Sequence, residues 1–455
     1  MNNRFLVALG LALGLSIGLS WIATARNIDL LTNESSANRF QQQNRNTTHP
    51  AHTSGFTVTP SITVYLPLIV KNTPVLLQWS DNVRVNDDTE SATQTEPAIA
   101  SDASGTAYAV WIDWRNGGQD VYFASNTPDG SWLQNVKIND NLTWAHNPAI
   151  GADAAGNIHA IWQSYGGLYN VLYAYRPSGG NWGIKVKVND DSGTPYKQRP
   201  KISVDEMGNA YAIWQDYRND PEGSCGSTCN SDVYFSYKDK VGNWQANLKI
   251  NDDGGITGQS APSIALDGTR NAYAVWSDPR NGSSPNIYFS YRAAGGMWGA
   301  NAQVNDDSGS ASHFWPMLAV DFSGNTCAIW VDNRNGNGDI WSSYRPSGGS
   351  WGPSMRVNDD IGTDEQISPS IGMDGSGNIY AIWVDLRGGQ KNIYSAFLPK
   401  TGNKWSVNTR VNDHDGSVAI YTTGIAIDSN GDVRAIWEDT RNGNSDIYSA
   451  YLVNP

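Results

Sequence analysis

Six recurring turns of the chain carry an Asp-x-Arg tripeptide, and each places a carboxylate and a guanidinium two residues apart. They comprise Asp113 with Arg115, Asp216 with Arg218, Asp278 with Arg280, Asp332 with Arg334, Asp385 with Arg387 and Asp439 with Arg441. Such a pair can bind the vicinal hydroxyls of a sugar, since one group accepts hydrogen bonds and the other donates them. It can also build structure, with the Asp capping a turn and the Arg joining a neighbouring loop. We favour the structural role, because it explains six repeats without any ligand.

Positions that differ from copy to copy are better candidates for a unique binding site. These candidates, which lie at or near the start of a recurring strand, are Glu96, Trp144, Tyr196, Arg199, His313, Trp315 and Tyr421. Exposed aromatic rings beside single charges suit stacking on the C–H faces of sugar rings, with the charge fixing the orientation. Loop aromatics also pack against neighbouring loops, and both interpretations stay open.

Neither a metal site nor a catalytic nucleophile has a specific sequence signature. The Asn-Asp-Asp runs, such as 189–191 and 305–307, could offer oxygen ligands to calcium, yet none has the DxDxDG spacing with a distal Glu. The histidines share no metal-ligand spacing, and no phosphate-binding glycine loop occurs. We therefore predict no metal and no cofactor, with calcium as the one ion left open.

Two series of tryptophans recur once per repeating unit, and this unit must position the candidate residues named above. The first is Trp111, Trp162, Trp214, Trp276, Trp330, Trp383 and Trp437, and the second is Trp79, Trp132, Trp182, Trp244, Trp298, Trp351 and Trp405. Each unit reads as four short strands joined by turns, with the second-series Trp in the fourth strand. The second strand has Ala two residues before its Trp and Val or Ile just before it, so both of its faces should be buried.

Four antiparallel strands repeated seven times predict an all-β, seven-bladed β-propeller over residues 76–455. The first unit begins with an unpaired fourth strand, 79–88, and the last unit stops after a third strand, 445–452. We expect these two segments to complete one blade together, which closes the ring and removes exposed strand edges. The Asp-x-Arg turns and the Asn-Asp-Asp loops would then share one face, and the variable residues would surround the mouth of a central channel.

The repeating unit resembles the sialidase-like, or Asp-box (BNR), propellers across roughly residues 79–455. That family carries SxDxGxTW between its third and fourth strands, and the matching hairpins here read SNTPDGSW at 125–132 and YRPSGGSW at 344–351. For sialidases proper, the resemblance implies three arginines around a carboxylate, a Tyr nucleophile with a Glu partner and an Asp acid/base. The arginine triad has no matching positions in this chain. Bacterial propeller lectins are similar in repeating one site per blade.

The N-terminal residues read as an export signal. Arg4 precedes an apolar run at 6–22, and residues 23–25 form a small-x-small cleavage site. We expect cleavage after Ala25, and an uncleaved membrane anchor is the alternative. Residues 26–75 are rich in Asn, Gln, Ser and Thr and should form a polar spacer with one apolar segment at 62–70.

Charge and cysteine content narrow the partners and the compartment. The formal net charge of −13 would repel phosphate backbones and anionic lipid, so we expect no nucleic-acid partner and no membrane contact beyond that anchor. Cys225 and Cys229 lie close together in a local insertion, and in an exported protein they could form a disulfide. Cys327 should be a buried free thiol.

These features favour an exported, non-catalytic propeller, secreted or at the cell surface, that binds glycans or a surface protein as a monomer. The binding face would be the one that carries the Asp-x-Arg turns. A sialidase-like glycoside hydrolase acting at the central mouth is the alternative, with Arg199, Glu96 and either Tyr196 or Tyr421 as its residues. A structural domain without a small ligand is a third hypothesis, because one fold serves many functions.

Overall fold

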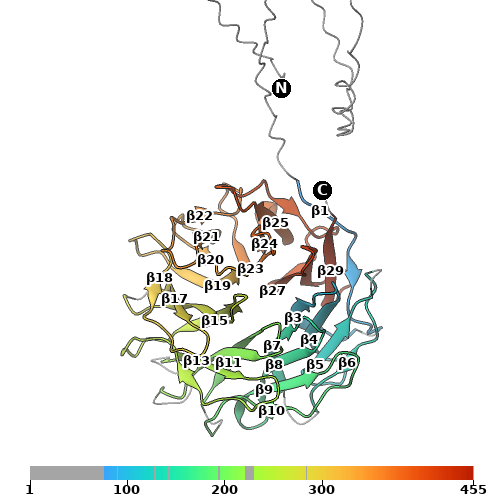
Figure 1. The fold of residues 1–455 in the computed structure, drawn as a ribbon. Coiled ribbons are helices and arrows are strands. Elements are labelled where there is room, and N and C mark those ends of the chain that lie inside the picture. Colours follow the sequence, from blue (N-terminus) through green and yellow to red (C-terminus); the bar gives the residue numbers. More distant parts are fainter. Residues whose placement is uncertain are drawn as a thin grey trace, which may run out of the picture. The chain divides into compact units, whose positions relative to one another are not determined.

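Seven antiparallel sheets arranged around a central axis make up the described chain (Figure 1). The computed structural model describes residues 76–89, 91–127, 130–140, 144–192, 195–220, 230–282 and 284–453, without the side chains of 420 and 421. These residues form strands, turns and one short 3-10 helix, η1 (Arg387–Gly389). The predicted all-β, seven-bladed propeller is confirmed. The predicted export signal and spacer, and the Cys225–Cys229 pair, lie outside the described residues.

Each of the first six blades runs in chain order from its innermost to its outermost strand. Blades 1 to 3 comprise β3 (Gln94–Ser101), β4 (Ala107–Asp113), β5 (Asp120–Ser125) and β6 (Val136–Lys137); β7 (Trp144–Ala152), β8 (Ile158–Tyr165), β9 (Tyr169–Arg176) and β10 (Val186–Lys187); and β11 (Lys197–Val204), β12 (Ala210–Asp216), β13 (Asp232–Lys238) and β14 (Leu248–Lys249). Blades 4 to 6 comprise β15 (Ser260–Leu266), β16 (Ala272–Asp278), β17 (Asn286–Arg292) and β18 (Ala302–Gln303); β19 (His313–Val320), β20 (Thr326–Asp332), β21 (Asp339–Arg345) and β22 (Met355–Arg356); and β23 (Gln366–Met373), β24 (Ile379–Asp385), β25 (Asn392–Leu398) and β26 (Thr409–Arg410).

Blade 7 joins the two ends of the described chain. Its inner strands are β27 (Val418–Ile427), β28 (Val433–Asp439) and β29 (Asp446–Val453), and both β1 (Gln78–Trp79) and β2 (Val83–Arg84) pair with β29. In Figure 1 the blue β1 lies beside the red β29. The predicted closure is confirmed, and it covers the strand edge that β29 would otherwise expose.

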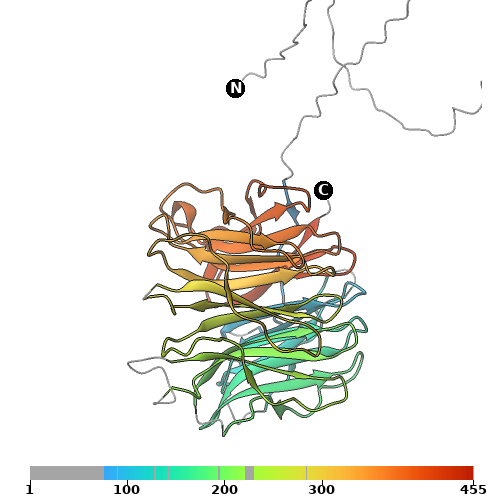
Figure 2. The same ribbon diagram turned by 60° about the vertical axis from the view of Figure 1, so that its left-hand side comes forward.

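The second strand of each blade is its most deeply buried element. Every residue of β4, β12, β16 and β20 is buried, and the first-series tryptophans are all 0% exposed. Seven hydrophobic clusters fill the ring, and each draws its residues from two neighbouring blades. Figure 2 shows the sheets stacked face to face. The prediction that this strand is buried on both faces is confirmed, because each face packs against a different neighbour.

The second-series tryptophan of each blade packs against the third strand of the preceding blade. Where that strand offers an aromatic ring, the two rings meet edge to face at 5.2 Å, in the pairs Phe123–Trp182, Tyr173–Trp244, Phe235–Trp298 and Phe289–Trp351. Where it offers a serine, the indole Nε1 donates to the hydroxyl, in the pairs Trp405–Ser342, Trp79–Ser395 and Trp132–Ser449. The second-series Trp therefore has an aromatic partner at four blade boundaries and a serine partner at three.

The outermost strand is shorter than the sequence suggested. In blades 1 to 6 it has only two residues, as in β6, which begins at Val136 after Trp132. The prediction that the second-series Trp sits within this strand is therefore wrong for these blades. The indole turns toward the neighbouring blade, and the next residue makes a backbone hydrogen bond that closes the turn, as Leu133 does with Ser125 at 2.9 Å.

Cys327 lies in β20 as a free, buried thiol, as predicted from the sequence. Burial raises the pKa of this thiol, so it stays protonated and packs as a small apolar side chain. Within the part of the chain that the structure describes, no helix has the length and apolar character needed to cross a membrane.

Replacing Ser342 by Ala should leave the buried Trp405 indole N–H without an acceptor. The Ser342 hydroxyl also donates to the Met355 carbonyl, so a second buried polar group would lose its partner. We expect the free energy of unfolding to fall by about 1–3 kcal/mol, measured by urea denaturation. In a Trp405→Phe background the same substitution should cost less, because the indole N–H is already absent. An equal loss in both backgrounds would contradict this role of the hydrogen bond.

Candidate functional site

Each Asp-x-Arg turn is tied into its blade by the aspartate. In blade 1, Asp113 is fully buried at the end of β4 and accepts hydrogen bonds at 2.9 Å from the Trp111 indole and from the Arg115 backbone N–H. The five other turns repeat both contacts. One carboxylate therefore caps the turn and also satisfies a buried N–H group.

The arginine of each turn reaches the connection from the preceding blade. Arg115 Nη1 lies 2.7 Å from Asp87, in the loop after β2, and its Nη2 donates to Asp113 and Asn135. Its guanidinium also lies over the Tyr122 ring, and the other five arginines cover an aromatic ring in the same way. Burial opposes ionisation of Asp87, but the hydrogen bonds from Asn135 and Arg115 outweigh it and lower the pKa of Asp87. These contacts engage all six pairs within the ring, which favours the structural interpretation.

The Asn-Asp-Asp loops are engaged in a similar way. Their first Asn accepts a hydrogen bond from a third-strand amide in all seven blades, as Asn86 does from Ile447 N–H at 2.8 Å. Their first Asp faces a bridging arginine at six boundaries, as shown for Asp87, which also accepts from a backbone amide. At the boundary with blade 2, Asp140 pairs with Lys185 instead. These oxygens thus serve turn and inter-blade contacts, which is different from the converging oxygens that calcium needs.

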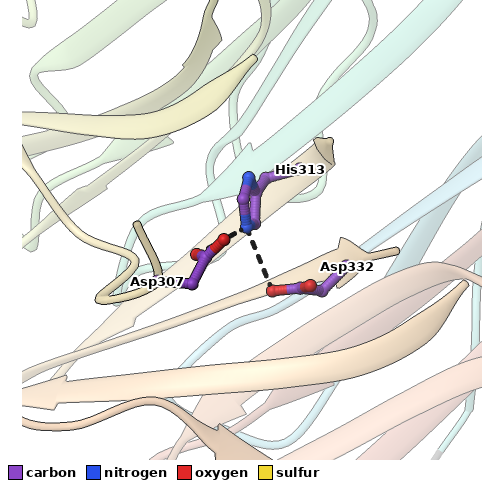
Figure 3. Close-up of side chains that lie close together, drawn as sticks. All are labelled: Asp307, His313 and Asp332. Carbon is purple, nitrogen blue, oxygen red and sulfur yellow. Dashed lines mark ion pairs between the residues drawn. The ribbon is translucent and has the colours of Figure 1, made fainter. Parts of the chain in front are cut away.

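The first residue of most innermost strands lies beside two carboxylates, and its identity changes from blade to blade. It is Gln94 in blade 1, Lys197 in blade 3, His313 in blade 5 and Gln366 in blade 6, and in blade 4 the equivalent Gln259 directly precedes β15. His313 Nε2 lies 2.9 Å from Asp307 and 3.2 Å from Asp332 (Figure 3). In blade 3, Lys197 Nζ lies 2.7 Å from the equivalent Asp191. His313 therefore occupies a position that a cation fills two blades away.

Asp307, His313 and Asp332 form the one cluster among the described residues whose spacing would suit a metal ion. Arg334 already lies 2.7 Å from Asp332 and 3.3 Å from Asp307, so a guanidinium neutralises both carboxylates. His313 Nδ1 lies 2.9 Å from the Pro285 carbonyl, so both ring nitrogens face acceptors, as an imidazolium requires. Burial alone would lower the pKa of His313, but the hydrogen bond and charge of Asp332 raise it. We assign the cluster to ring structure, with His313 as its cation.

Blade 2 departs from the repeated link at both of its charged positions. Ser164 and Gly166 stand where the other blades have Asp and Arg. The fully buried indole N–H of Trp162 consequently has no hydrogen-bond partner among the described residues. The contact to blade 1 is rebuilt from another segment, since Lys185 pairs with Asp140. Blade 2 thus keeps its attachment to the ring without using its turn between the second and third strands.

That turn of blade 2 carries aromatic side chains instead. We define the blade 2–3 aromatic cluster as Trp144, Tyr165, Tyr169, Tyr196 and Tyr217. The Tyr165 and Tyr169 rings stack with centroids 4.5 Å apart, Tyr169 meets the edge of Tyr196 at 4.5 Å, and Tyr196 meets Tyr217 at 5.7 Å. Trp144 lies opposite Tyr165 in the β7–β8 pairing. The cluster therefore spans the boundary between blades 2 and 3.

The cluster is anchored at one end and exposed at the other. Tyr217 is 2% exposed, and its hydroxyl accepts hydrogen bonds from Gln198 and Gln215 at 2.8 and 2.9 Å. Trp144 and Tyr165 are 59% and 41% exposed. Desolvation and the neighbouring tyrosines raise the pKa of Tyr169, so its hydroxyl remains a neutral hydrogen-bond donor.

Six residues that precede the recurring proline share an unusual backbone conformation. They have φ between 47° and 55° at a β-bulge of the innermost strand: Glu96, Asn147, Arg199, Ala261, Trp315 and Ser368. This left-handed region is uncommon for residues other than glycine. The Glu96 carboxylate accepts a hydrogen bond from Asn147 N–H, and Asn147 Oδ1 accepts one from Arg199 N–H at 3.3 Å. The bulges therefore link blades 1, 2 and 3 around the axis.

Four of the residues that we predicted for ligand binding fall into two groups. Trp144 and Tyr196 belong to the blade 2–3 aromatic cluster. Glu96 and Arg199 occupy the bulges of blades 1 and 3, connected through Asn147. Arg199 is half-buried, and it is the one arginine among the six bulge residues.

The other predicted residues belong to neither of these two groups. Trp315 is 42% exposed on blade 5 and contacts Phe314. His313 was expected near an exposed surface and is instead fully buried, because two carboxylates hold it in the ring. Tyr421 lies in β27, and its side chain is outside the described part of the structure.

Sequence reasoning missed Tyr165, Tyr169 and Glu438. The loss of Asp and Arg from the blade 2 turn was the available signal for the two tyrosines. Glu438 is 4% exposed in β28, and it accepts a hydrogen bond from the Ser445 hydroxyl at 2.6 Å, while its Oε2 has no partner among the described residues. Burial, with a contribution from the charge of Glu96, raises the pKa of Glu438. No repeat pattern marks this residue, because it occurs in one blade only.

Comparison with known proteins supports the fold alone. No protein-family model matches the sequence, and a search of curated proteins finds no match. An ulvan lyase from a new family of polysaccharide lyases aligns with a TM-score of 0.57 at 13% identity, over 83% of this chain and 96% of that one. A lectin from Burkholderia pseudomallei aligns with a TM-score of 0.54 at 11% identity, over 77% and 97%. A protein of unknown function from Dyadobacter fermentans gives 0.51 at 10% identity, over 83% and 99%.

Replacing His313 by Gln should be tolerated, because three other blades carry Gln at this position. The folded-state pKa of His313 is raised, so its stabilising contribution is present below the ordinary value of 6.5 and is lost as the pH rises through the raised value. The wild type should therefore lose stability relative to His313→Gln between about pH 5.5 and about pH 8.5, measured by thermal unfolding. His313→Ala should be less stable than both at the lower pH. A gap between wild type and His313→Gln that does not change with pH would refute the assignment.

Proposed function

We propose that the protein is an exported, non-catalytic propeller that binds glycans through the blade 2–3 aromatic cluster. The observation that carries the proposal is the exposure of Trp144 and Tyr165 on blade 2, the one blade that lacks the Asp–Arg pair. Elsewhere this turn holds the ring together. In blade 2 the same turn presents aromatic rings to solvent.

The cluster has the physical properties of a sugar-binding surface. Exposed tyrosine and tryptophan rings stack on the apolar C–H faces of sugars, and neighbouring hydroxyls supply hydrogen bonds. The Tyr165 ring is supported by Tyr169, which in turn rests on Tyr196 and the buried Tyr217. Rings held in place before binding lose less conformational freedom on binding, and this favours affinity.

Further features support this proposal. Two of the structurally similar proteins are a lectin and a lyase of a polysaccharide. The N-terminal export signal would place the protein outside the cytoplasm, secreted or at the cell surface, where glycans are abundant. The net charge of −13 disfavours nucleic acid. We propose that the propeller acts as a monomer with a glycan or a glycosylated surface protein as its partner.

Glycoside hydrolysis near the central axis is the second candidate, and one observation favours it. The pKa of Glu438 is raised by burial, with Glu96 nearby. A carboxylic acid of this kind can protonate a leaving oxygen while a second carboxylate stays ionised. The bulge residues include only Arg199 as a guanidinium, so an arginine triad of the sialidase kind has no support there. We therefore rank binding first.

Glycan-array binding by the full chain tests the proposed site. Tyr165→Ala and Trp144→Ala should each weaken binding by about tenfold, since each removes a stacking surface. Trp315→Ala is the matched control, because Trp315 is 42% exposed, like Tyr165 at 41%, but lies on blade 5. Binding should be unchanged in that variant. Equal loss in all three variants would move the site away from the cluster, and no binding to any glycan would sink the proposal.

Fluorogenic glycosides distinguish the second candidate. Turnover by the wild type that disappears in Glu438→Gln, with folding intact by circular dichroism, would establish a hydrolase in place of a binding protein. We expect no turnover in either.

A further inference from the structure

A cavity of about 470 Å³ opens between blades 4 and 5, on the face opposite the blade 2–3 aromatic cluster. This face carries the turns between first and second strands and between third and fourth strands. Tyr273 and Tyr291 of blade 4 and Phe322 and Arg345 of blade 5 line the cavity. Its volume lies within the range of small-molecule sites, about 300–1,000 Å³.

The boundary between blades 3 and 4 shows how the same residue types can close this space. There, Arg292 is 5% exposed and lies over the rings of Phe235 and Tyr237, at 5.3 and 5.1 Å. Tyr237 is stacked on Tyr211, with an interplanar angle of 22°. The arginine and the two tyrosines thus pack on one another.

Between blades 4 and 5 this packing is broken. Tyr291 stands edge-on to Tyr273 at an interplanar angle of 66°. Arg345 lies over Phe289 at 5.1 Å and covers no other ring among the described residues. The Tyr291 ring and the guanidinium therefore line an open space instead of covering each other.

Phe322 forms the outer wall of the cavity and is 63% exposed. Its ring lies over Gly268 of blade 4, where a Cβ atom would come within 2.2 Å of the ring and would displace it. Arg270 has φ of 68° at the turn position where the other blades carry glycine. The blade 4 turn therefore has its glycine beneath Phe322 and not at the strained position.

Of the charged residues Asp267 and Arg345 in the cavity wall, only Arg345 has hydrogen-bonding groups left for a ligand. Asp267 accepts five hydrogen bonds, from the amides and side chains of Thr269 and Asn271 and from the Tyr273 hydroxyl. Its lone pairs are used within the turn. Arg345 makes no ion pair or side-chain hydrogen bond with any described residue, so its donors remain for a ligand.

We propose that this cavity binds a ring that bears a carboxylate, as in a uronic-acid residue of an acidic glycan. The Arg345 guanidinium would take the carboxylate through paired hydrogen bonds. Phe322 and Tyr291 would contact the apolar face of the ring. The site is separate from the blade 2–3 aromatic cluster, and the proposal does not depend on that cluster.

Calorimetric titration of the full chain tests the proposal. The ligands are tetrasaccharides that contain glucuronate, galacturonate or mannuronate, each beside its carboxyl-reduced counterpart. We expect binding of at least one acidic tetrasaccharide, weakened about tenfold or more by carboxyl reduction, by Arg345→Gln and by Phe322→Ala. Phe322→Ala should fold normally, because blade 2 has Ala154 at the equivalent turn position.

Arg176→Gln is the matched control, since Arg176 occupies the same strand position in blade 2 and lies over Phe123 at 5.2 Å. It should leave binding unchanged. The proposal is overturned if no acidic tetrasaccharide binds, if the carboxyl-reduced forms bind equally well, or if Arg176→Gln weakens binding as much as Arg345→Gln. Loss caused by Tyr165→Ala alone would assign the binding to the blade 2–3 aromatic cluster instead.

Discussion

A buried carboxylate at the end of the second strand is the contact on which the ring depends. In six blades this Asp accepts from the indole of the central tryptophan, caps the following turn and holds the arginine that reaches the preceding blade. A buried anion is costly unless it is paired and hydrogen-bonded, so each contact needs the others. Glutamine, lysine or histidine at the start of the innermost strand completes the arrangement. The repeat thus tolerates neutral and charged partners as long as the carboxylate is satisfied.

Departures from the repeated pattern coincide with the two surfaces that we propose for binding. Blade 2 has neither the Asp nor the Arg, keeps its bridge through Lys185, and presents the stacked Tyr165 and Tyr169. Blade 4 has Arg270 at the turn position where the other blades have glycine, and Phe322 of the next blade covers its Gly268. In blade 2 the Lys185–Asp140 pair takes the place of the missing arginine contact. A ring of near-identical blades can therefore vary one boundary without disturbing the others.

Most of the fold could be predicted from the sequence, because the fold repeats. Seven copies of one tryptophan pattern predict the blades, and the unpaired ends predict how the ring closes. The bulges could not be predicted, since Glu96, Arg199 and Trp315 are not residue types that favour positive φ. The burial of His313 depends on Asp307 and Asp332 coming together from a loop and another strand. The cavity beside Phe322 depends on ring orientations, which no spacing encodes.

The pairing of β1 with β29 has a consequence for the order in which the chain is made. Blades 1 to 6 are each built from one continuous segment, so they can form as the segments emerge. Gln78 precedes blade 1 in the chain, yet its partner Val453 follows all six of these blades. The strands β1 and β2 must therefore remain unpaired until β29 has been made, and long-range pairing of this kind is slow. A nascent chain that stops short of β29 therefore lacks the outer part of blade 7, because β1 and β2 have no strand to pair with.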